Sequence, residues 1–324
     1  MNKYLKVLRK YPFYLYPFLF INFFFGQLLF YLFRLKIKLL GIKYIIVELF
    51  NGKKMILDSN DRGLSHDLLF DPKKQREEFA SNYIINHFKE NPEEVFFDLG
   101  CNLGYYSILL SDYFDKIIGV EPVKSSAEIC VLNSKINHFE NKFTLIEGAI
   151  APKSGFVKID DKVAKNLVTV SSVFEKGSVG DCKSYTISEI CNLQKIKKID
   201  FLKMDIEGYE YEIIVEGQEE FFKFAPKMIF LEVHFGILDY NKSVELLTIL
   251  KKNGYFVDKA YCEIKYKAKW MGFFSVSIQN FFQKILTLHN SGLVFENVDI
   301  NEVLKDKNIM NAKSGAIEFI FKKM

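Results

Sequence analysis

The stretch of residues 95–107, VFFDLGCNLGYYS, constrains the fold of this chain more than any other part of the sequence. It begins with the apolar residues of a short strand that ends at Asp98, and it continues into a turn with glycines at positions 100 and 104. A helix-like pattern starts at Tyr105, and a second apolar strand ends in the acid Glu121. A strand, a glycine turn, a helix and a second strand that ends in an acid are the signature of a Rossmann-type nucleotide site.

The details of the turn favour one class of nucleotide. A dinucleotide site typically has the spacing G-x-G-x-x-G, which lets a pyrophosphate lie on the amides of a helix N-terminus. Here Gly100 and Gly104 are spaced G-x-x-x-G, and Asn102 stands in the place of a middle glycine. The carboxylate of Asp98 would repel a phosphate at this turn, but it would suit the ammonium group of a methionine. The turn therefore favours S-adenosylmethionine over NAD(P), with Glu121 accepting hydrogen bonds from both ribose hydroxyls.

Four blocks of sequence occur in an order that resembles a known family. FDLGCNLGYYS resembles the DVGANxGxYS signature of the FkbM family of S-adenosylmethionine-dependent methyltransferases. The blocks GVEPVKSSAEIC, FLKMDIEGYEYEIIVEG and IFLEVH follow in that family's order. The similarity covers roughly residues 64–260, with Cys101 where alanine is usual and Tyr209 where a small residue is common.

The resemblance implies how each part of the cofactor would be held. The residues of the glycine turn would wrap the methionine part, the acid after the second strand would hold the ribose, and the backbone around Gly148 would lie by the adenine. The predicted cofactor-binding residues are Asp98, Gly100, Asn102, Gly104, Tyr105, Glu121, Glu147 and Ala149.

Candidate catalytic residues lie at the ends of two later predicted strands, residues 199–204 and 227–233. Ligands of open α/β sheets bind outside the carboxyl ends of the strands, where Asp205, Glu207, Glu232 and His234 all fall. Histidine titrates near neutrality, so His234 could take a proton from an acceptor hydroxyl as the methyl group moves, and Asp205 is the alternative base. Structural roles remain open for two of them: Glu207 could interact with a helix dipole, and His234 could bond a loop carbonyl.

A metal is an alternative interpretation of the same residues. Asp205, Glu232 and His234 could bind a divalent ion that orients the acceptor. No spacing in the sequence demands a metal, so a divalent metal is possible but not favoured, and the predicted set of metal ligands is empty.

Alternating strands and helices predict an α/β fold. We expect a doubly wound, mostly parallel, seven-stranded sheet of the class I methyltransferase type, closed by a strand at residues 317–322. Four regions are predicted. Residues 1–42 would form a hydrophobic N-terminal helix, 43–92 a hairpin and a helix, 93–260 the methyltransferase core, and 261–324 an aromatic-rich insertion with the closing strand.

The N-terminal region is predicted to associate with a membrane. Residues 11–33 carry no charge, and basic residues lie on both sides of them. The length suits a membrane span, whereas the prolines, tyrosines and cationic flanks suit a helix in the membrane interface. A buried helical arm is a further alternative, and a cleavable signal peptide is not expected. Because S-adenosylmethionine is made in the cytosol, the catalytic domain is expected to be cytoplasmic, associated with the membrane through residues 11–40.

Composition narrows the function further. A net charge of +4 is too balanced to argue for nucleic acid as a partner, and five scattered cysteines indicate reduced thiols. The predicted function is S-adenosylmethionine-dependent O-methylation of a hydroxyl on a sugar, glycan or lipid-linked acceptor. The alternatives are an NAD(P)-dependent nucleotide-sugar oxidoreductase and a non-catalytic, membrane-anchored binding module.

Overall fold

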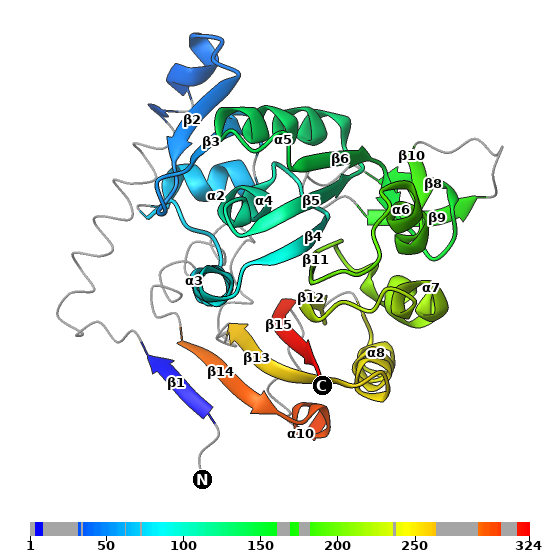
Figure 1. The fold of residues 1–324 in the computed structure, drawn as a ribbon. Helices are drawn as coiled ribbons and strands as arrows, with labels where there is room; N and C mark the ends of the chain where they lie inside the picture. The colour runs from blue at the N-terminus through cyan, green and yellow to red at the C-terminus, as the bar shows by residue number, and fades with distance from the viewer. Residues whose placement is uncertain are drawn as a thin grey trace, which may run out of the picture.

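The computed structural model describes residues 4–8, 32–33, 35–61, 63–71, 73–160, 169–174, 182–235, 238–263, 291–305 and 316–324. A nine-stranded sheet runs through the centre of the molecule (Figure 1). Its strands are β1 (Tyr4–Leu8), β4 (Glu93–Leu99), β5 (Phe114–Glu121), β6 (Phe143–Glu147), β11 (Phe201–Met204), β12 (Met228–His234), β13 (Tyr255–Glu263), β14 (Ser291–Val298) and β15 (Ala316–Lys323). Their order across the sheet is β1-β14-β13-β15-β12-β11-β4-β5-β6.

The seven strands from β13 to β6 confirm the predicted mostly parallel sheet. The pairs from β12 through β11, β4 and β5 to β6 are all parallel, whereas β15 runs antiparallel to both of its neighbours, β12 and β13. Two further strands were not predicted: β14 pairs antiparallel with β13, and β1 pairs antiparallel with β14. Part of the expected insertion therefore belongs to the sheet.

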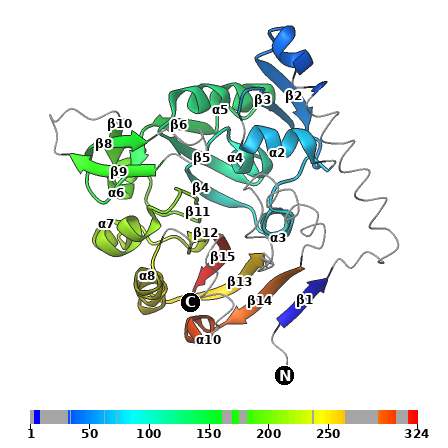
Figure 2. The same ribbon diagram turned by 180° about the vertical axis from the view of Figure 1, so that it is seen from behind.

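Helices cover both faces of the sheet, as a doubly wound fold requires (Figures 1 and 2). One face carries α2 (Leu64–Phe70), α3 (Glu78–Glu90), α4 (Tyr105–Leu110) and α5 (Lys124–Ile136). The other carries α6 (Ile187–Leu193), α7 (Gln218–Phe222), α8 (Tyr240–Lys252) and α10 (Ile300–Lys305). Each face has its own core of buried apolar side chains.

Aromatic side chains fill the core on the α3 side. Phe88 of α3 contacts Phe114 and Phe201, with ring centroids 4.7 and 4.9 Å apart, and Phe96 lies 5.0 Å from Phe201. All four side chains are buried, and each contributes about 1.5–3 kcal/mol through removal of apolar surface from water. This core fixes α3 against β4 and β11, the strands whose far ends carry the functional residues.

Two smaller sheets flank the central one. The hairpin predicted across Asn51 and Gly52 is present as β2 (Tyr44–Glu48) and β3 (Lys54–Asp58). It is fastened to α5, because the backbone N–H of Ile56 donates to Asn133 Oδ1 at 2.6 Å. The second is a four-stranded sheet of β7 (Ala149–Ile150), β10 (Cys182–Tyr185), β8 (Gly155–Asp160) and β9 (Thr169–Phe174).

The chain after β11 does not become helical at Glu207, where the sequence left a helix-dipole role open. Glu207 and Gly208 have φ values of 55° and 96°, which a right-handed helix excludes. The helical segments there are the π-helix η2 (Glu212–Glu216) and then α7. Glu207 is therefore not at a helix N-terminus, and a helix dipole does not explain its position.

The predicted N-terminal helix is only partly covered by the structure. Residues 35–39 are helical, whereas residues 11–31 lie outside the described residues, as does the aromatic core of the expected insertion, residues 270–288. Within the described ranges, every helix is too short or too polar to pass through a bilayer.

Candidate functional site

The glycine turn after β4 has a backbone that few residues can adopt. Gly100, Asn102 and Gly104 have φ values of 71°, 51° and 84°. The N–H groups of Gly100 and Cys101 donate to the carbonyl of Val120 at 3.0 and 3.1 Å, which binds the turn to β5. A Cβ on Gly100 would lie 2.0 Å from the backbone oxygen of Asp205, so glycine is required where the tips of β4 and β11 meet.

A pocket opens at this edge of the sheet. It encloses about 900 Å³, including the open solvent at its mouth. The predicted cofactor residues that line it are Asp98, Gly100, Asn102, Tyr105, Glu121 and Ala149. The pocket therefore reaches from the turn after β4 to the start of β7.

Two predicted cofactor residues do not line the pocket. Glu147 is exposed at the end of β6, and the following residue, Gly148, takes the lining position instead. Gly104 supports the turn from behind: a Cβ there would lie 2.7 Å from Cys130 Sγ of α5. Glu147 therefore lies outside the pocket lining, and its contact with the cofactor stays a prediction.

Glu121 is buried at the tip of β5 and is held by the turn. Its Oε2 accepts a hydrogen bond from Asn102 N and its Oε1 accepts one from Val123 N, both at 2.9 Å. Burial raises the pKa of Glu121 to about 7, although the two backbone hydrogen bonds oppose the shift. The position fits the predicted role as a ribose acceptor.

Asp98 and Lys203 form the floor of the pocket. Asp98 Oδ2 accepts hydrogen bonds from Ser107 N at 3.1 Å and Ser107 Oγ at 2.7 Å. Its other oxygen, Oδ1, is buried without a hydrogen-bond partner in the described structure, 3.7 Å from Lys203 Nζ. Burial raises the pKa of Asp98, while Lys203 and Ser107 oppose that shift. Oδ1 is thus available to a ligand cation.

Lys203 was not predicted as a site residue. It lies beside Asp98 in the register of β4 and β11, donates from Nζ to Gly100 O at 2.9 Å, and is 3.7 Å from Asp205 Oδ2. Burial opposes its charge, but the two carboxylates raise its pKa, so it remains an ammonium. A lysine within the apolar strand F-L-K-M was the signal that could have revealed it.

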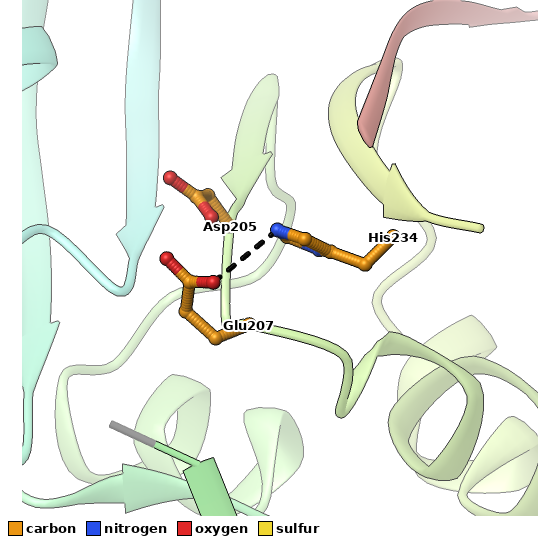
Figure 3. Close-up of side chains that lie close together, drawn as sticks. All are labelled: Asp205, Glu207 and His234. Atoms are coloured by element: carbon orange, nitrogen blue, oxygen red, sulfur yellow. Dashed lines mark ion pairs between the residues drawn. The ribbon is translucent and has the colours of Figure 1, made fainter. Parts of the chain in front are cut away.

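The four predicted catalytic residues come together at the ends of β11 and β12. Figure 3 shows His234 directed at the carboxylates of Asp205 and Glu207. His234 Nε2 lies 3.4 Å from Glu207 Oε2 and 4.0 Å from Glu232 Oε1. Asp205 and Glu207 also line the pocket, whereas His234 and Glu232 are not among the lining residues.

The cluster shifts the pKa of each of its members. Burial opposes the charged form of His234, but its hydrogen bond to Glu210 and the surrounding carboxylates raise its pKa to about 10. Burial and repulsion by Asp205 raise the pKa of Glu207 to about 7 and that of Glu232 well above its usual range. Burial acts in the same direction on Asp205, but Lys203 and other cations lower its pKa. The sequence predicts that His234 titrates near neutrality. In this arrangement its pKa is higher, because the carboxylates stabilise its proton.

Glu210 is a further site residue that the sequence did not single out. It is fully buried, and its Oε1 lies 3.1 Å from His234 Nδ1. The same oxygen accepts a hydrogen bond from Gly208 N at 3.1 Å, so Glu210 holds both the imidazole and the loop that carries Glu207. Only its place in the DIEGYE segment, after two predicted site acids, could have indicated this role.

Residues before α3 complete the pocket wall. Arg76, Glu77 and Tyr106 are lining residues that were not predicted. Arg76 Nε pairs with Glu77 Oε1 at 2.7 Å, and the hydroxyl of Tyr106 donates to Glu77 Oε2 at 2.6 Å. Arg76 and Glu77 lie outside every motif, because a loop remote in sequence brings them to the site, whereas Tyr106 lies within the FDLGCNLGYYS block and was not singled out.

Comparison with known proteins relates the central part of the chain to one family. Residues 98–257 match the family model of the methyltransferase FkbM domain. A search of curated proteins finds no match.

Solved structures with a similar fold include three from archaea. TYW2 of M. jannaschii in complex with AdoMet is 13% identical, with 87% of each chain covered and a TM-score of 0.39. The M. jannaschii tRNA m1G37 methyltransferase is 12% identical, with 87% of this chain and 57% of that chain covered and a TM-score of 0.42. Precorrin 8W decarboxylase of Methanobacterium thermoautotrophicum is 13% identical, with 77% and 91% covered and a TM-score of 0.39. The likeness is one of fold alone.

Proposed function

Because residues 98–257 of this chain form a methyltransferase FkbM domain, we propose that the protein is an S-adenosylmethionine-dependent O-methyltransferase acting on a hydroxyl of a sugar, glycan or lipid-linked acceptor. The charge of the pocket is the observation that carries the choice of cofactor. Five lining residues are acids, Glu77, Asp98, Glu121, Asp205 and Glu207, and two are basic, Arg76 and Lys203. An acidic pocket attracts a sulfonium cation and repels a pyrophosphate, which counts against NAD(P).

The residues of the pocket fit the parts of S-adenosylmethionine. The unpartnered Oδ1 of Asp98 can accept from the ammonium group, and Glu121 can accept from the ribose hydroxyls. Gly148 and Ala149 line the pocket where the adenine would lie. These assignments would place the methyl group toward Asp205 and Glu207.

The cofactor supplies an activated methyl group, so the protein mainly aligns it with the acceptor and excludes water. A hydroxyl acceptor must lose its proton as the new bond forms. Asp205 and Glu207, which line the pocket, are the proposed proton acceptors. His234 and Glu232 lie behind them and position their carboxylates.

Calorimetry with S-adenosylmethionine and with NADPH tests the cofactor directly. We expect S-adenosylmethionine alone to bind, and tight binding of NADPH alone would contradict the proposal.

Mass spectrometry of surface polysaccharides and lipids, from cells with and without the protein, then tests the acceptor. The expected change is the loss of one CH2 per modified hydroxyl. Asp205→Asn should retain cofactor binding and lose methyl transfer. A non-catalytic binding module would have no methyl transfer to lose.

The catalytic domain is proposed to act in the cytoplasm, attached to a membrane through residues 11–40. Apolar side chains are exposed at the end of this segment and just after it: Leu39 is 77% exposed, and Leu40 and Ile46 are each 61% exposed. Lys36, Lys38 and Lys43 lie among them in the sequence. Exposed apolar side chains with neighbouring lysines are typical of surfaces that bind anionic membranes.

A further inference from the structure

We propose that Asp205, Glu207 and His234 together bind one divalent cation of the Mn²⁺ class at the edge of the pocket. The role of this cation, orienting the acceptor hydroxyl, rests on the proposed function, but its binding does not. From the sequence, the alternative metal ligands are Asp205, Glu232 and His234, and a metal is not favoured. The structure replaces Glu232 with Glu207 and supplies the geometry that the sequence lacked.

The three side chains come close enough to share an ion. One ligand atom from each lies within 4.8 Å of the others, and His234 Nε2 is 3.4 Å from Glu207 Oε2 (Figure 3). Octahedral cations with ligands at about 2.0–2.1 Å place neighbouring ligand atoms about 3 Å apart. Side-chain rotations alone could therefore close the three groups on a cation. One imidazole with two carboxylates suits Mn²⁺ and related first-row ions.

The imidazole is oriented for this purpose by a buried carboxylate. Glu210, which is fully buried, contacts Nδ1 of His234 at 3.1 Å and leaves Nε2 directed toward Asp205 and Glu207. Metal-bound histidines commonly donate their other ring N–H to a carboxylate in this way, which fixes the tautomer and the ring orientation. Glu210 is in turn anchored by the N–H groups of Gly208 and Ile206.

A ligand atom for the ion is already unpartnered. Oδ1 of Asp205 is buried without a hydrogen-bond partner among the residues that the structure describes, whereas Oδ2 lies 3.7 Å from Lys203 Nζ, and the Asp205 carboxyl group also interacts with the side chain of Glu232. A buried carboxylate oxygen without a donor is costly unless a cation satisfies it. This oxygen therefore points to a ligand independently of the spacing of the cluster.

The local charge balance also favours a cation. Four carboxylates, those of Asp205, Glu207, Glu210 and Glu232, surround a single imidazole, and they outnumber the cations even with Lys203, 3.7 Å from Asp205, included. The alternative is an imidazolium that pairs with the acids and leaves no room for an ion. A bound cation would require neutral imidazole at Nε2, so the two arrangements exclude each other. Since Asp205 and Glu207 line the pocket, the cation would face the acceptor hydroxyl and could polarise it.

Mn²⁺ binding to the full chain, stripped with chelator and free of S-adenosylmethionine, tests the proposal. Electron paramagnetic resonance should count one Mn²⁺ per chain, and spin-echo modulation should show a directly bound imidazole nitrogen. Glu207→Gln and His234→Gln should each weaken binding by about tenfold or more, and Glu210→Gln by about 10–100-fold as expected for an orienting carboxylate. His234→Gln should also remove the nitrogen signal.

Asp299→Asn is the matched control, because Asp299 is an exposed carboxylate that pairs with Lys251 at 2.8 Å, away from the pocket. It should leave Mn²⁺ affinity unchanged. Circular dichroism melting checks that each variant folds; if His234→Gln does not fold, Glu207→Gln carries the test. The proposal is overturned if Mn²⁺ does not bind at about 1 mM, a weak-affinity limit, or if the folded Glu207→Gln protein binds it as well as the wild type. A protein that binds Mn²⁺ but not S-adenosylmethionine would contradict the methyltransferase assignment and leave the cation site standing.

Discussion

Glu207 combines a functional carboxylate with an unfavourable backbone. Its φ of 55° places a non-glycine residue in the left-handed region, next to Gly208 at 96°. Such a conformation costs about 1–2 kcal/mol for a residue with a Cβ, and strain of this kind is found at functional sites. The loop thus holds Glu207 in the pocket at the expense of local stability.

Replacement of Glu207 by glycine and by alanine separates this strain from the carboxylate. Both variants lose the carboxylate, so both should lose most methyl transfer. Glu207→Gly relieves the strain, and its free energy of unfolding should exceed that of Glu207→Ala by about 1 kcal/mol. Urea denaturation of the two proteins measures the difference. Equal stabilities would show that the loop does not enforce the left-handed backbone.

Glu121 should make cofactor affinity depend on pH. Burial raises its pKa to about 7 in the free protein, and the ionised form is the better acceptor for ribose hydroxyls. S-adenosylmethionine should therefore bind more tightly as pH rises, by up to about tenfold between about pH 6 and about pH 8. Calorimetry across this range measures the effect. Glu121→Gln should bind weakly with a flat profile; a variant profile as steep as the wild type would contradict the assignment.

At the scale of elements, Asp200 connects three strands at the edge opposite the pocket. It precedes β11, accepts hydrogen bonds from the N–H groups of Glu94 and Val95, and pairs with Lys227 at 2.8 Å. Burial opposes its charge, but the bonds from Lys227 and Val95 lower its pKa. A lowered pKa stabilises the fold above the ordinary carboxyl value near 3.8, and this stabilisation is lost as pH falls through the folded value.

Asp200→Asn should lower the free energy of unfolding by about 1–3 kcal/mol at neutral pH, because one partner of a buried network is removed. The deficit should shrink as the solution is acidified below the ordinary carboxyl pKa. Chemical denaturation at several pH values measures both effects. Glu140→Gln, which changes an exposed carboxyl, is the control and should have little effect at any pH. A deficit independent of pH would exclude the electrostatic explanation.

The sequence predicted the central elements well, because their signals are local. The turn around Gly100, the acids at the strand ends and the alternation of strands and helices are each contained in a few neighbouring residues. The late start of the helix after Glu207 could not be predicted, because the loop there depends on the buried Glu210, which accepts from Gly208 N, and on the close approach of Asp205 to the tip of β4. The pocket roles of Arg76 and Lys203 likewise depend on contacts between segments far apart in the chain, those of Arg76 with Tyr105 and of Lys203 with Asp98.

At the scale of the whole molecule, the exposed apolar side chains near the N-terminus predict membrane binding. The full chain should float with vesicles that contain anionic lipids, and high salt should weaken the binding because lysines contribute. A Leu39→Ser and Leu40→Ser double variant should float less. Leu193→Ser is the control, because Leu193 is 60% exposed on α6. Wild-type protein that stays unbound at low salt would contradict the membrane proposal.

The pairing of β1 with β14 limits how such attachment can occur. β1 belongs to the central sheet, and the β2–β3 hairpin is attached to α5, so the folded domain contains the chain on both sides of residues 9–31. Both ends of this segment must then lie on one side of a bilayer, which rules out an odd number of passages. One membrane-spanning helix takes about 20 residues, so this segment is too short to cross the bilayer and return. The protein would therefore be attached to a single leaflet of the bilayer. A lipid-linked acceptor would have to present its hydroxyl on the water-facing side of that leaflet.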